Sequence, residues 1–210
     1  MAAYMHCFDM ETQLRVGKKG EDVFLAYVNQ LKEDGKITEV IDVREDPQAQ
    51  KDDVDFIVRF ANGKTYSFEI KGDEHETGNL YVETGIDSLK DGQFIRHDNG
   101  WIYKTKATFV FYVMLATQEV YVATPKAIVA YTNEAMRPGS GEIRPRSASA
   151  LNFDKEDRSR SWYANGYCIK AEGLYNHRCS KDQCWKLLYA DYDEENKTAK
   201  FQNAKLAVPF

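Results

Sequence analysis

The stretch from Val54 to Lys71 constrains the fold of this chain more than any other feature. Apolar and polar residues alternate on both sides of Asn62-Gly63, and a period of two is typical of β-strands. Asn-Gly between two such runs is also a strong hairpin signal. We therefore predict two antiparallel strands joined by a turn, with Asp55 at the start of the first strand and Glu69 near the end of the second.

The length of the turn decides whether two carboxylates of the hairpin meet. A two-residue loop places Asp55 opposite Ile70, so that Asp55 and Glu69 point to different faces of the sheet. A three-residue loop, with its glycine in the left-handed position of a G1 bulge, pairs Phe60 with Lys64 and places Asp55 opposite Glu69. Facing carboxylates favour a hard divalent cation such as Mg²⁺. We predict the second register, because it builds a metal site without a further bulge.

A helix is expected before the hairpin. After Gly17-Lys18-Lys19-Gly20-Glu21, apolar residues recur at the spacing of one helix face: Val23, Phe24, Tyr27, Val28 and Leu31. This pattern predicts an amphipathic helix from about Gly20 to Lys32 with Glu21 in its first turn. An acid in that position also suits the positive end of the helix dipole.

This order of helix glutamate, strand aspartate and strand Glu-X-Lys resembles the PD-(D/E)XK nuclease superfamily, over roughly residues 17 to 125. The Gly-X-X-X-Glu start of the helix looks like that of archaeal Holliday junction resolvases and some phage nucleases. No proline precedes Asp55, a departure that many members of the superfamily share. The resemblance implies an α/β fold of the restriction-endonuclease-like kind, in which helices flank a mixed central sheet.

The resemblance also implies an activity and a role for each residue of the motif. Asp55 and Glu69, with the carbonyl of Ile70, would hold Mg²⁺ or Mn²⁺. Lys71 would orient or deprotonate the attacking water, and Glu21 would complete the site from the helix. The expected reaction is endonucleolytic hydrolysis of DNA, and many relatives form a homodimer that cuts both strands.

The remaining core is expected within residues 1–135. Strands are predicted at 37–43, 80–83, 107–115 and 118–123, and loops at 46–53, 72–78 and 86–100. The strand at 107–115 is continuously apolar, which is typical of a strand buried on both faces. Thr124-Pro125 predicts the start of a helix that reaches Asn133. Residues 136–210 are expected to form a C-terminal extension packed on this core, with no function assigned.

Several residues outside the motif are candidates for contact with DNA. The loop from Arg137 to Arg146 is rich in arginine, whose fork matches phosphate geometry, although a solvated loop explains it equally well. The candidate phosphate contacts are Arg137, Arg144, Arg146, Lys104, Lys106 and Gln93.

Other side chains are candidates for supporting chemistry. His75 and His97 could assist a proton transfer, but surface histidines are the common case, and Glu83 could be a further acid at the metal site. Four residues could be read as a zinc site, but their spacing matches no strong ligand pattern. They are Cys168, His177, Cys179 and Cys184.

The net charge of −5 argues against a protein that coats DNA regardless of sequence, but it leaves room for a local basic patch. No apolar run approaches the roughly 20 residues of a membrane helix, and we see no signal peptide. We therefore expect a soluble cytoplasmic protein. Three alternatives stay open: an exonuclease of the same fold, a non-catalytic nucleic-acid-binding protein on a degenerate nuclease fold, and a fold outside the superfamily.

Overall fold

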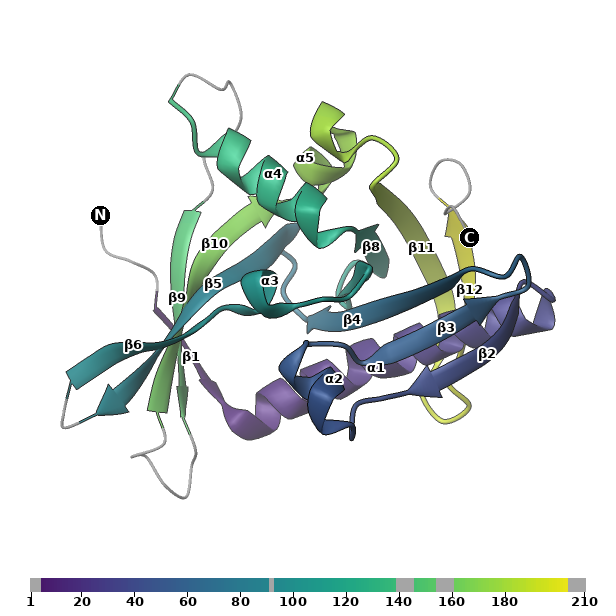
Figure 1. Cartoon of the computed structure of the whole chain (residues 1–210), viewed down its shortest axis with the longest axis horizontal. Helices are drawn as coiled ribbons and strands as arrows, with labels where there is room; N and C mark the ends of the chain where they lie inside the picture. The colour runs from purple at the N-terminus through teal and green to yellow at the C-terminus, as the bar shows by residue number, and fades with distance from the viewer. Residues whose placement is uncertain (1–4, 91–92, 139–145, 154–160, 204–210) are drawn as a thin grey trace.

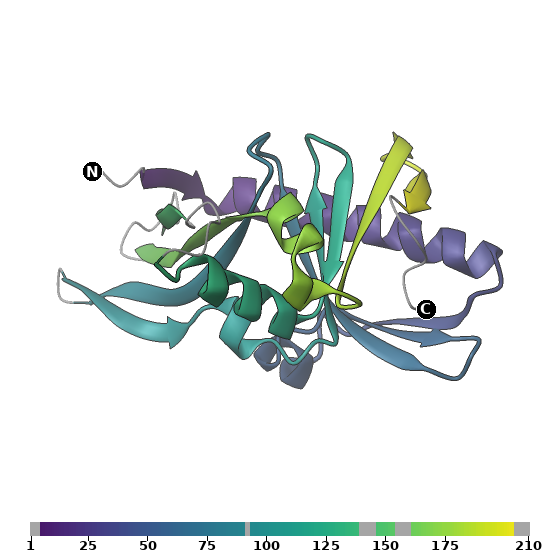
Figure 2. The same ribbon diagram turned by 90° about the horizontal axis from the view of Figure 1, so that it is seen from above.

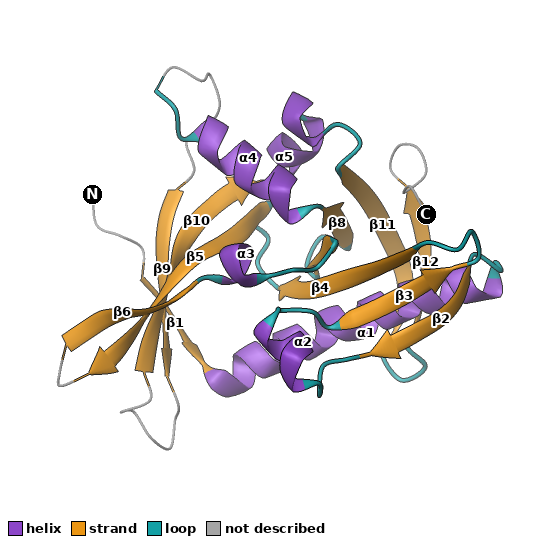
Figure 3. Cartoon of the chain, viewed as in Figure 1, coloured by secondary structure: helices purple, strands orange, loops and turns teal. Residues whose placement is uncertain are grey.

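A computed structural model of the chain describes residues 5–90, 93–138, 146–153 and 161–203. It is an α/β protein with two β-sheets and helices packed against them (Figures 1 and 3). The seven-stranded sheet, called here the large sheet, has the order β12-β11-β8-β7-β4-β3-β2. The five-stranded sheet, called here the small sheet, has the order β1-β9-β10-β5-β6.

Both sheets are mixed. The strands of the large sheet are β2 (Ile37–Asp42), β3 (Phe56–Phe60), β4 (Thr65–Asp73), β7 (Phe109–Met114), β8 (Glu119–Ala123), β11 (Cys184–Asp193) and β12 (Thr198–Asn203). Those of the small sheet are β1 (Met5–Asp9), β5 (Asn79–Lys90), β6 (Gln93–Asn99), β9 (Arg146–Phe153) and β10 (Ser161–Lys170). Strand β4 pairs in parallel with β7, and β1 pairs in parallel with β9, whereas the other pairs are antiparallel.

Helix α1 (Met10–Glu33) runs along the molecule from the small sheet across one face of the large sheet (Figures 1 and 2). The expected start at Gly20 was wrong, because the residues from Met10 onward contain no proline and continue the same helix through Gly17. Glu21 therefore lies in the middle of α1, and Glu11 is the acid in its first turn. The helix dipole does not explain Glu21.

The predicted central strand is buried on both faces. Phe111 and Val113 of β7 belong to a core with α1, β3 and β8, whereas Val110 and Tyr112 belong to a second core with β5, β10 and helix α4 (Pro125–Ala135). Phe24 of α1 anchors the first core, with its ring centroid 4.9–5.2 Å from those of Phe56, Phe68 and Phe111. Burial on both faces explains why this strand reads as a continuous apolar run.

The hairpin has the predicted three-residue turn. The Phe60 N–H donates to the Lys64 carbonyl at 2.8 Å, and Gly63 has the left-handed φ of +82° that the turn requires. The ladder pairs Phe56 with Phe68, and the Asp55 N–H donates to the Phe68 carbonyl at 2.8 Å. The pairs from Phe56 to Arg59 have the predicted register, but the regular ladder ends one residue before Asp55, so the pairing of Asp55 with Glu69 stays a prediction.

Other expectations are confirmed in part. Strands β7 and β8 and helix α4 lie where they were predicted, and the Thr124 hydroxyl accepts a hydrogen bond from the Ala127 N–H at 3.1 Å. The expected loop at 46–53 holds the short helix α2 (Pro47–Lys51), and β4 extends through Asp73 into the expected loop at 72–78. Pro47 at the first helical position and an Asp46 cap explain α2.

The expected loop at 86–100 was wrong. These residues continue β5, form β6 and lead into the short helix α3 (Trp101–Lys104). All residues of β6 are exposed, so the strand lacks the apolar alternation by which sequence reveals a strand.

Residues beyond 136 contribute to both sheets. Strand β11 pairs with β8, and β10 pairs with β5, while helix α5 (Ala171–Asn176) and a 3₁₀ turn (Arg178–Ser180) lie between β10 and β11. Strands from both sides of the expected boundary at residue 135 are therefore interleaved. Within the described ranges, no helix has the length and apolar character needed to cross a membrane.

Candidate active site

Glu69 and Lys71 lie side by side on β4, on the face turned away from α1. Their neighbours Phe68 and Ile70 pack into the core beneath α1, and side chains alternate between the faces of a strand. Glu69 is only 4% exposed, and its Oε1 atom forms an ion pair with Nζ of Lys71. The structure thus places Lys71 on the same face as Glu69, next to its carboxylate.

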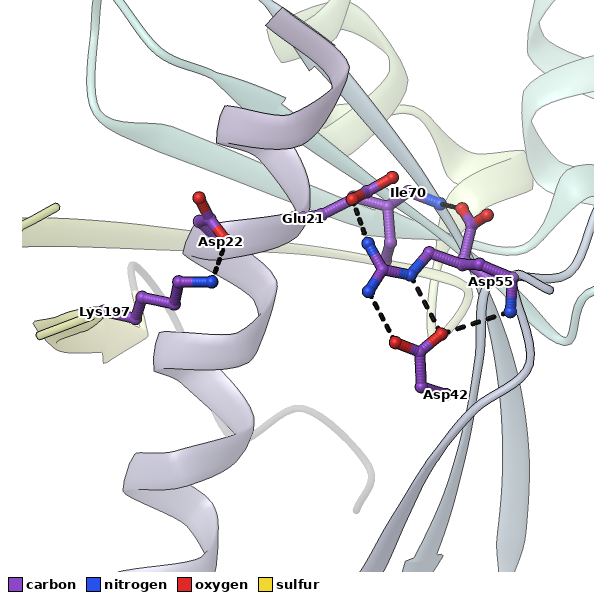
Figure 4. A network of polar contacts seen from close by, with 7 residues as sticks. Glu21, Asp22, Asp42, Asp55, Ile70 and Lys197 are labelled. Carbon is purple, nitrogen blue, oxygen red and sulfur yellow. Dashed lines mark hydrogen bonds and ion pairs between the residues drawn. The ribbon is translucent and has the colours of Figure 1, made fainter. Parts of the chain in front are cut away.

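Asp55 is fixed against the same strand. Its Oδ2 atom accepts a hydrogen bond from the Ile70 N–H at 2.7 Å, as Figure 4 shows. Because Asp55 comes just before β3, its side chain reaches across the end of the hairpin. Asp55, Glu69, Ile70 and Lys71, which the sequence predicted to act together, are therefore brought together.

Two glycines bring α1 close to this part of β4. A Cβ atom on Gly72 would lie 2.5 Å from the carbonyl oxygen of Val16, and one on Gly20 would lie 3.1 Å from the backbone of Gly72. Only residues without a side chain allow this approach. The contact places Glu21, the next residue of α1, beside the end of the hairpin.

The carboxylate of Glu21 forms an ion pair with Arg44. Nη1 of Arg44 bonds to Oε2 of Glu21, and the same guanidinium bonds to Asp42 at the end of β2 (Figure 4). Burial raises the pKa of Glu21, Arg44 lowers it, and the nearby charge of Asp55 raises it. Glu21 therefore lies within electrostatic reach of Asp55.

Three neighbours of Lys71 were missed or only weakly predicted from sequence. The Lys71 Nζ atom lies 5.5 Å from the ring centroid of Trp101, and the Trp101 N–H donates to Oε1 of Glu83 at 3.3 Å. Asp53 has a left-handed φ of 44°, and its Oδ2 atom is buried without a hydrogen-bond partner among the described residues. Such backbone strain is common at functional sites.

The charges around Lys71 shift one another's titration. Burial raises the pKa of Glu69 above its ordinary value; Lys71 acts in the opposite direction, and Asp55 and Asp53 add to the increase. Burial lowers the pKa of Lys71, but the carboxylates of Glu69, Asp55 and Asp53 outweigh burial and raise it above its ordinary value. The pKa of Glu83 is raised by burial, and Lys71 opposes this increase.

The side chains around Asp55 and Glu69 suit a hard cation for two reasons. Their donor atoms are carboxylate oxygens, and the carboxylates outnumber the positively charged side chains. The buried Oδ2 of Asp53 adds an oxygen that has no hydrogen-bond partner in the part of the chain that the structure describes. Within the described part of the chain, however, no group of three or more His, Cys, Asp or Glu side chains forms a ready-made metal site. Lys71 and Arg44 already engage Glu69 and Glu21, so an incoming cation would compete with both.

The candidate phosphate contacts that the structure describes lie on or beside three different elements. Lys104 ends α3, between Asp53 at 3.9 Å and Asp98 at 3.5 Å, and Lys106 pairs with Asp52 at 2.7 Å. Gln93 is exposed at the start of β6, and Arg137 is exposed just after α4. Arg144 and the side chain of Arg146 fall outside the described residues, so the arginine loop stays a prediction.

The histidines and cysteines lie on several elements. His75 follows β4 and His97 lies on the exposed strand β6. Cys168 belongs to β10, His177 follows α5 and Cys184 belongs to β11, whereas the side chain of Cys179 is not described.

Comparisons with known proteins assign no family to the chain. No protein-family model, no curated protein and no solved structure matches it.

Proposed function

We propose that this protein is a metal-dependent DNA endonuclease that hydrolyses phosphodiester bonds at Asp55, Glu69 and Lys71. The register of the hairpin carries the proposal, since it puts Asp55 against the strand that bears Glu69 and Lys71. An ordinary surface hairpin would expose its terminal acid and lysine, whereas Glu69 is buried beside Lys71.

The arrangement of the large sheet supports a restriction-endonuclease-like core. Strands β2, β3 and β4 are antiparallel, β7 then lies parallel to β4, and α1 covers one face. The motif lies on the strand that joins the antiparallel part to the parallel part. Mixed pairing at this point agrees with the mixed central sheet that the resemblance implies.

Asp55 and Glu69, with the carbonyl of Ile70, would hold Mg²⁺ or Mn²⁺. Such a cation supplies charge neutralisation at the phosphate and lowers the pKa of bound water. Burial of Glu69 strengthens its interaction with any nearby charge, because the surroundings screen the charge poorly. The hydrogen bond from Ile70 to Asp55 limits the rotation of that carboxylate.

Lys71 would act as a hydrogen-bond donor. Its ammonium group has three donors, and its bond to Glu69 uses one of them. The surrounding carboxylates raise the pKa of Lys71, so the side chain stays protonated at neutral pH. We therefore assign it to orienting water and stabilising negative charge on the phosphate, rather than to removing a proton.

An assay with several DNA substrates tests the proposal. The protein is incubated with supercoiled plasmid, linear duplex, single strand and a four-way junction, each with Mg²⁺, Mn²⁺ or EDTA. We expect cleavage with either cation and none with EDTA. Opening of the closed plasmid distinguishes an endonuclease from an exonuclease, which requires ends.

Matched variants then test the residues. Glu69→Gln and Asp55→Asn each remove a charge at nearly constant shape, and each should abolish cleavage. Glu39→Gln is the control, because Glu39 is an exposed acid of β2 that pairs with Arg59 at 2.6 Å. Full activity in both site variants would refute the assignment.

A further inference from the structure

We propose that Arg44 is a positioning residue of this site, which holds Glu21 when no divalent cation is bound and competes with the cation for it. This inference rests on the proposed function and adds a residue that regulates how readily the site accepts its cation. Arg44 lies in the turn between β2 and α2, outside the predicted motif.

Arg44 is held in place by contacts that do not involve Glu21. Its Nε donates to Oδ1 of Asp42 at 2.9 Å, Nη2 bonds to Oδ2 of the same carboxylate, and the Arg44 N–H donates to Oδ1 at 3.1 Å. Two parallel bonds of this kind fix both distance and orientation. The guanidinium carbon also lies 4.9 Å from the ring centroid of Phe56. The remaining nitrogen, Nη1, is thereby directed at Glu21.

Glu21 lies between this fixed guanidinium and the carboxylate of Asp55. The side chain of Glu21 is 25% exposed, so water screens its charge only in part. The Asp55 charge repels it and the Arg44 charge attracts it. Arg44 thus offsets a repulsion that would otherwise be present on the α1 side of the site.

A divalent cation at Asp55 would offset the repulsion between Glu21 and Asp55 in the same way as Arg44, but with twice the charge. Arg44 and the cation are therefore alternative partners of one carboxylate. The glycine contact between α1 and β4 keeps Glu21 near both. Arg44 should accordingly weaken cation binding, and it should do so through Glu21.

A purely structural role makes a different prediction. If Arg44 only tied α1 to the turn after β2, its removal would lower the stability of the fold and leave cation affinity unchanged. If Arg44 acted only through its long-range field, its removal would tighten cation binding whether or not Glu21 is present.

Calorimetric titration of the full chain with Mn²⁺ separates these cases. The variants are Arg44→Gln, Glu21→Gln and the double variant. Arg59→Gln is the control, because Arg59 is an exposed arginine of the neighbouring strand β3 that pairs with Glu39. We expect Arg44→Gln to bind Mn²⁺ roughly two- to fivefold more tightly, the range of a partly exposed ion pair. In the Glu21→Gln background the same change should have no effect.

Arg44→Lys sharpens the test. It keeps the charge but cannot form the two-bond fork with Asp42, so its affinity for Mn²⁺ should lie between those of the parent and Arg44→Gln. Thermal unfolding in EDTA shows whether each variant is folded. A folded Arg44→Gln variant with unchanged or weaker Mn²⁺ affinity overturns the inference, as does equal tightening in both backgrounds.

Failure of this inference differs from failure of the proposed function. Cleavage that requires Glu69, with no coupling between Arg44 and Glu21, leaves the nuclease and removes the role of Arg44. Coupled Mn²⁺ binding without cleavage of any DNA leaves the role of Arg44 and removes the nuclease. A parent protein that binds no Mn²⁺ overturns the inference.

Discussion

The large and small sheets differ in how deeply they are buried. The central strand β7 of the large sheet is covered on both faces, whereas every residue of β6, at the edge of the small sheet, is exposed. The candidate site follows this division. Glu69 and Lys71 stand on the large sheet beside β7, and the small sheet contributes Glu83 at their periphery.

This contrast shows where a precise site can be built. A strand packed on both faces cannot shift without disturbing the core, so the charged residues on β4 keep a fixed geometry. An exposed edge strand such as β6 has few packed neighbours and can adjust at little cost. We therefore expect changes near β4 to affect activity or stability strongly, and matched changes at the exposed edge of the small sheet to have small effects.

The largest contrast should appear in hydrolysis. Lys71→Ala should reduce the single-turnover rate by roughly 10²- to 10⁴-fold, the contribution of a well-placed catalytic group. Arg96→Ala removes a cation from the exposed strand β6, where it pairs with Asp87 at 3.8 Å, and should change the rate about twofold or less. Equal losses in the two variants would mean that both sheets take part in the chemistry.

A second contrast concerns the stability of the two sheets. Phe24→Ala removes a fully buried ring that contacts three others, and should lower the free energy of unfolding by about 3–5 kcal/mol. Phe94→Ala removes a ring that is 40% exposed on β6, and should cost under about 1 kcal/mol. Urea unfolding measures both. A large loss in Phe94→Ala would show that the edge strand β6 is packed as tightly as the buried strands.

A third contrast compares the same substitution, glycine to alanine, on the two sheets. A methyl group on Gly72 would collide with the Val16 carbonyl in α1, so Gly72→Ala should cost about 1–3 kcal/mol and also reduce cleavage. A methyl group on Gly85 of β5 meets the guanidinium of Arg96, a flexible side chain that can move away. Gly85→Ala should therefore leave activity unchanged. Retained activity in Gly72→Ala would show that the site tolerates a displaced α1.

The difference between buried and exposed strands also explains which elements could be predicted from the sequence. The hairpin, β7 and α4 were predicted because burial, a turn glycine and a helix cap each impose a local pattern. The register of β3 and β4 followed from the turn, and with it the position of Asp55 beside the strand that bears Glu69. Strand β6 was missed because an exposed strand has no apolar alternation.

The site was predictable only along β3 and β4. Arg44, Asp53 and Trp101 reach Glu21 or Lys71 from loops or from a short helix, and no periodicity connects such residues to the motif. The start of α1 was misplaced because Gly17 and Gly20 suggested a boundary. In the structure, Gly20 is kept free of a side chain by its contact with β4 rather than by a helix end.

The smallest expected effect is the difference in stability between Gly17→Ala and Gly20→Ala in α1. Beyond the adjacent residues of the helix, no described atom lies within 4 Å of the position that a Cβ on Gly17 would take, so Gly17→Ala adds no collision. Alanine loses less backbone entropy than glycine in a helix, and the variant should be more stable by about 0.5–1 kcal/mol. Gly20→Ala gains the same entropy but meets the backbone of Gly72 at 3.1 Å, which should cancel or reverse the gain. Thermal unfolding of both variants measures the difference, and equal stabilisation by the two would mean that α1 is not pressed against β4.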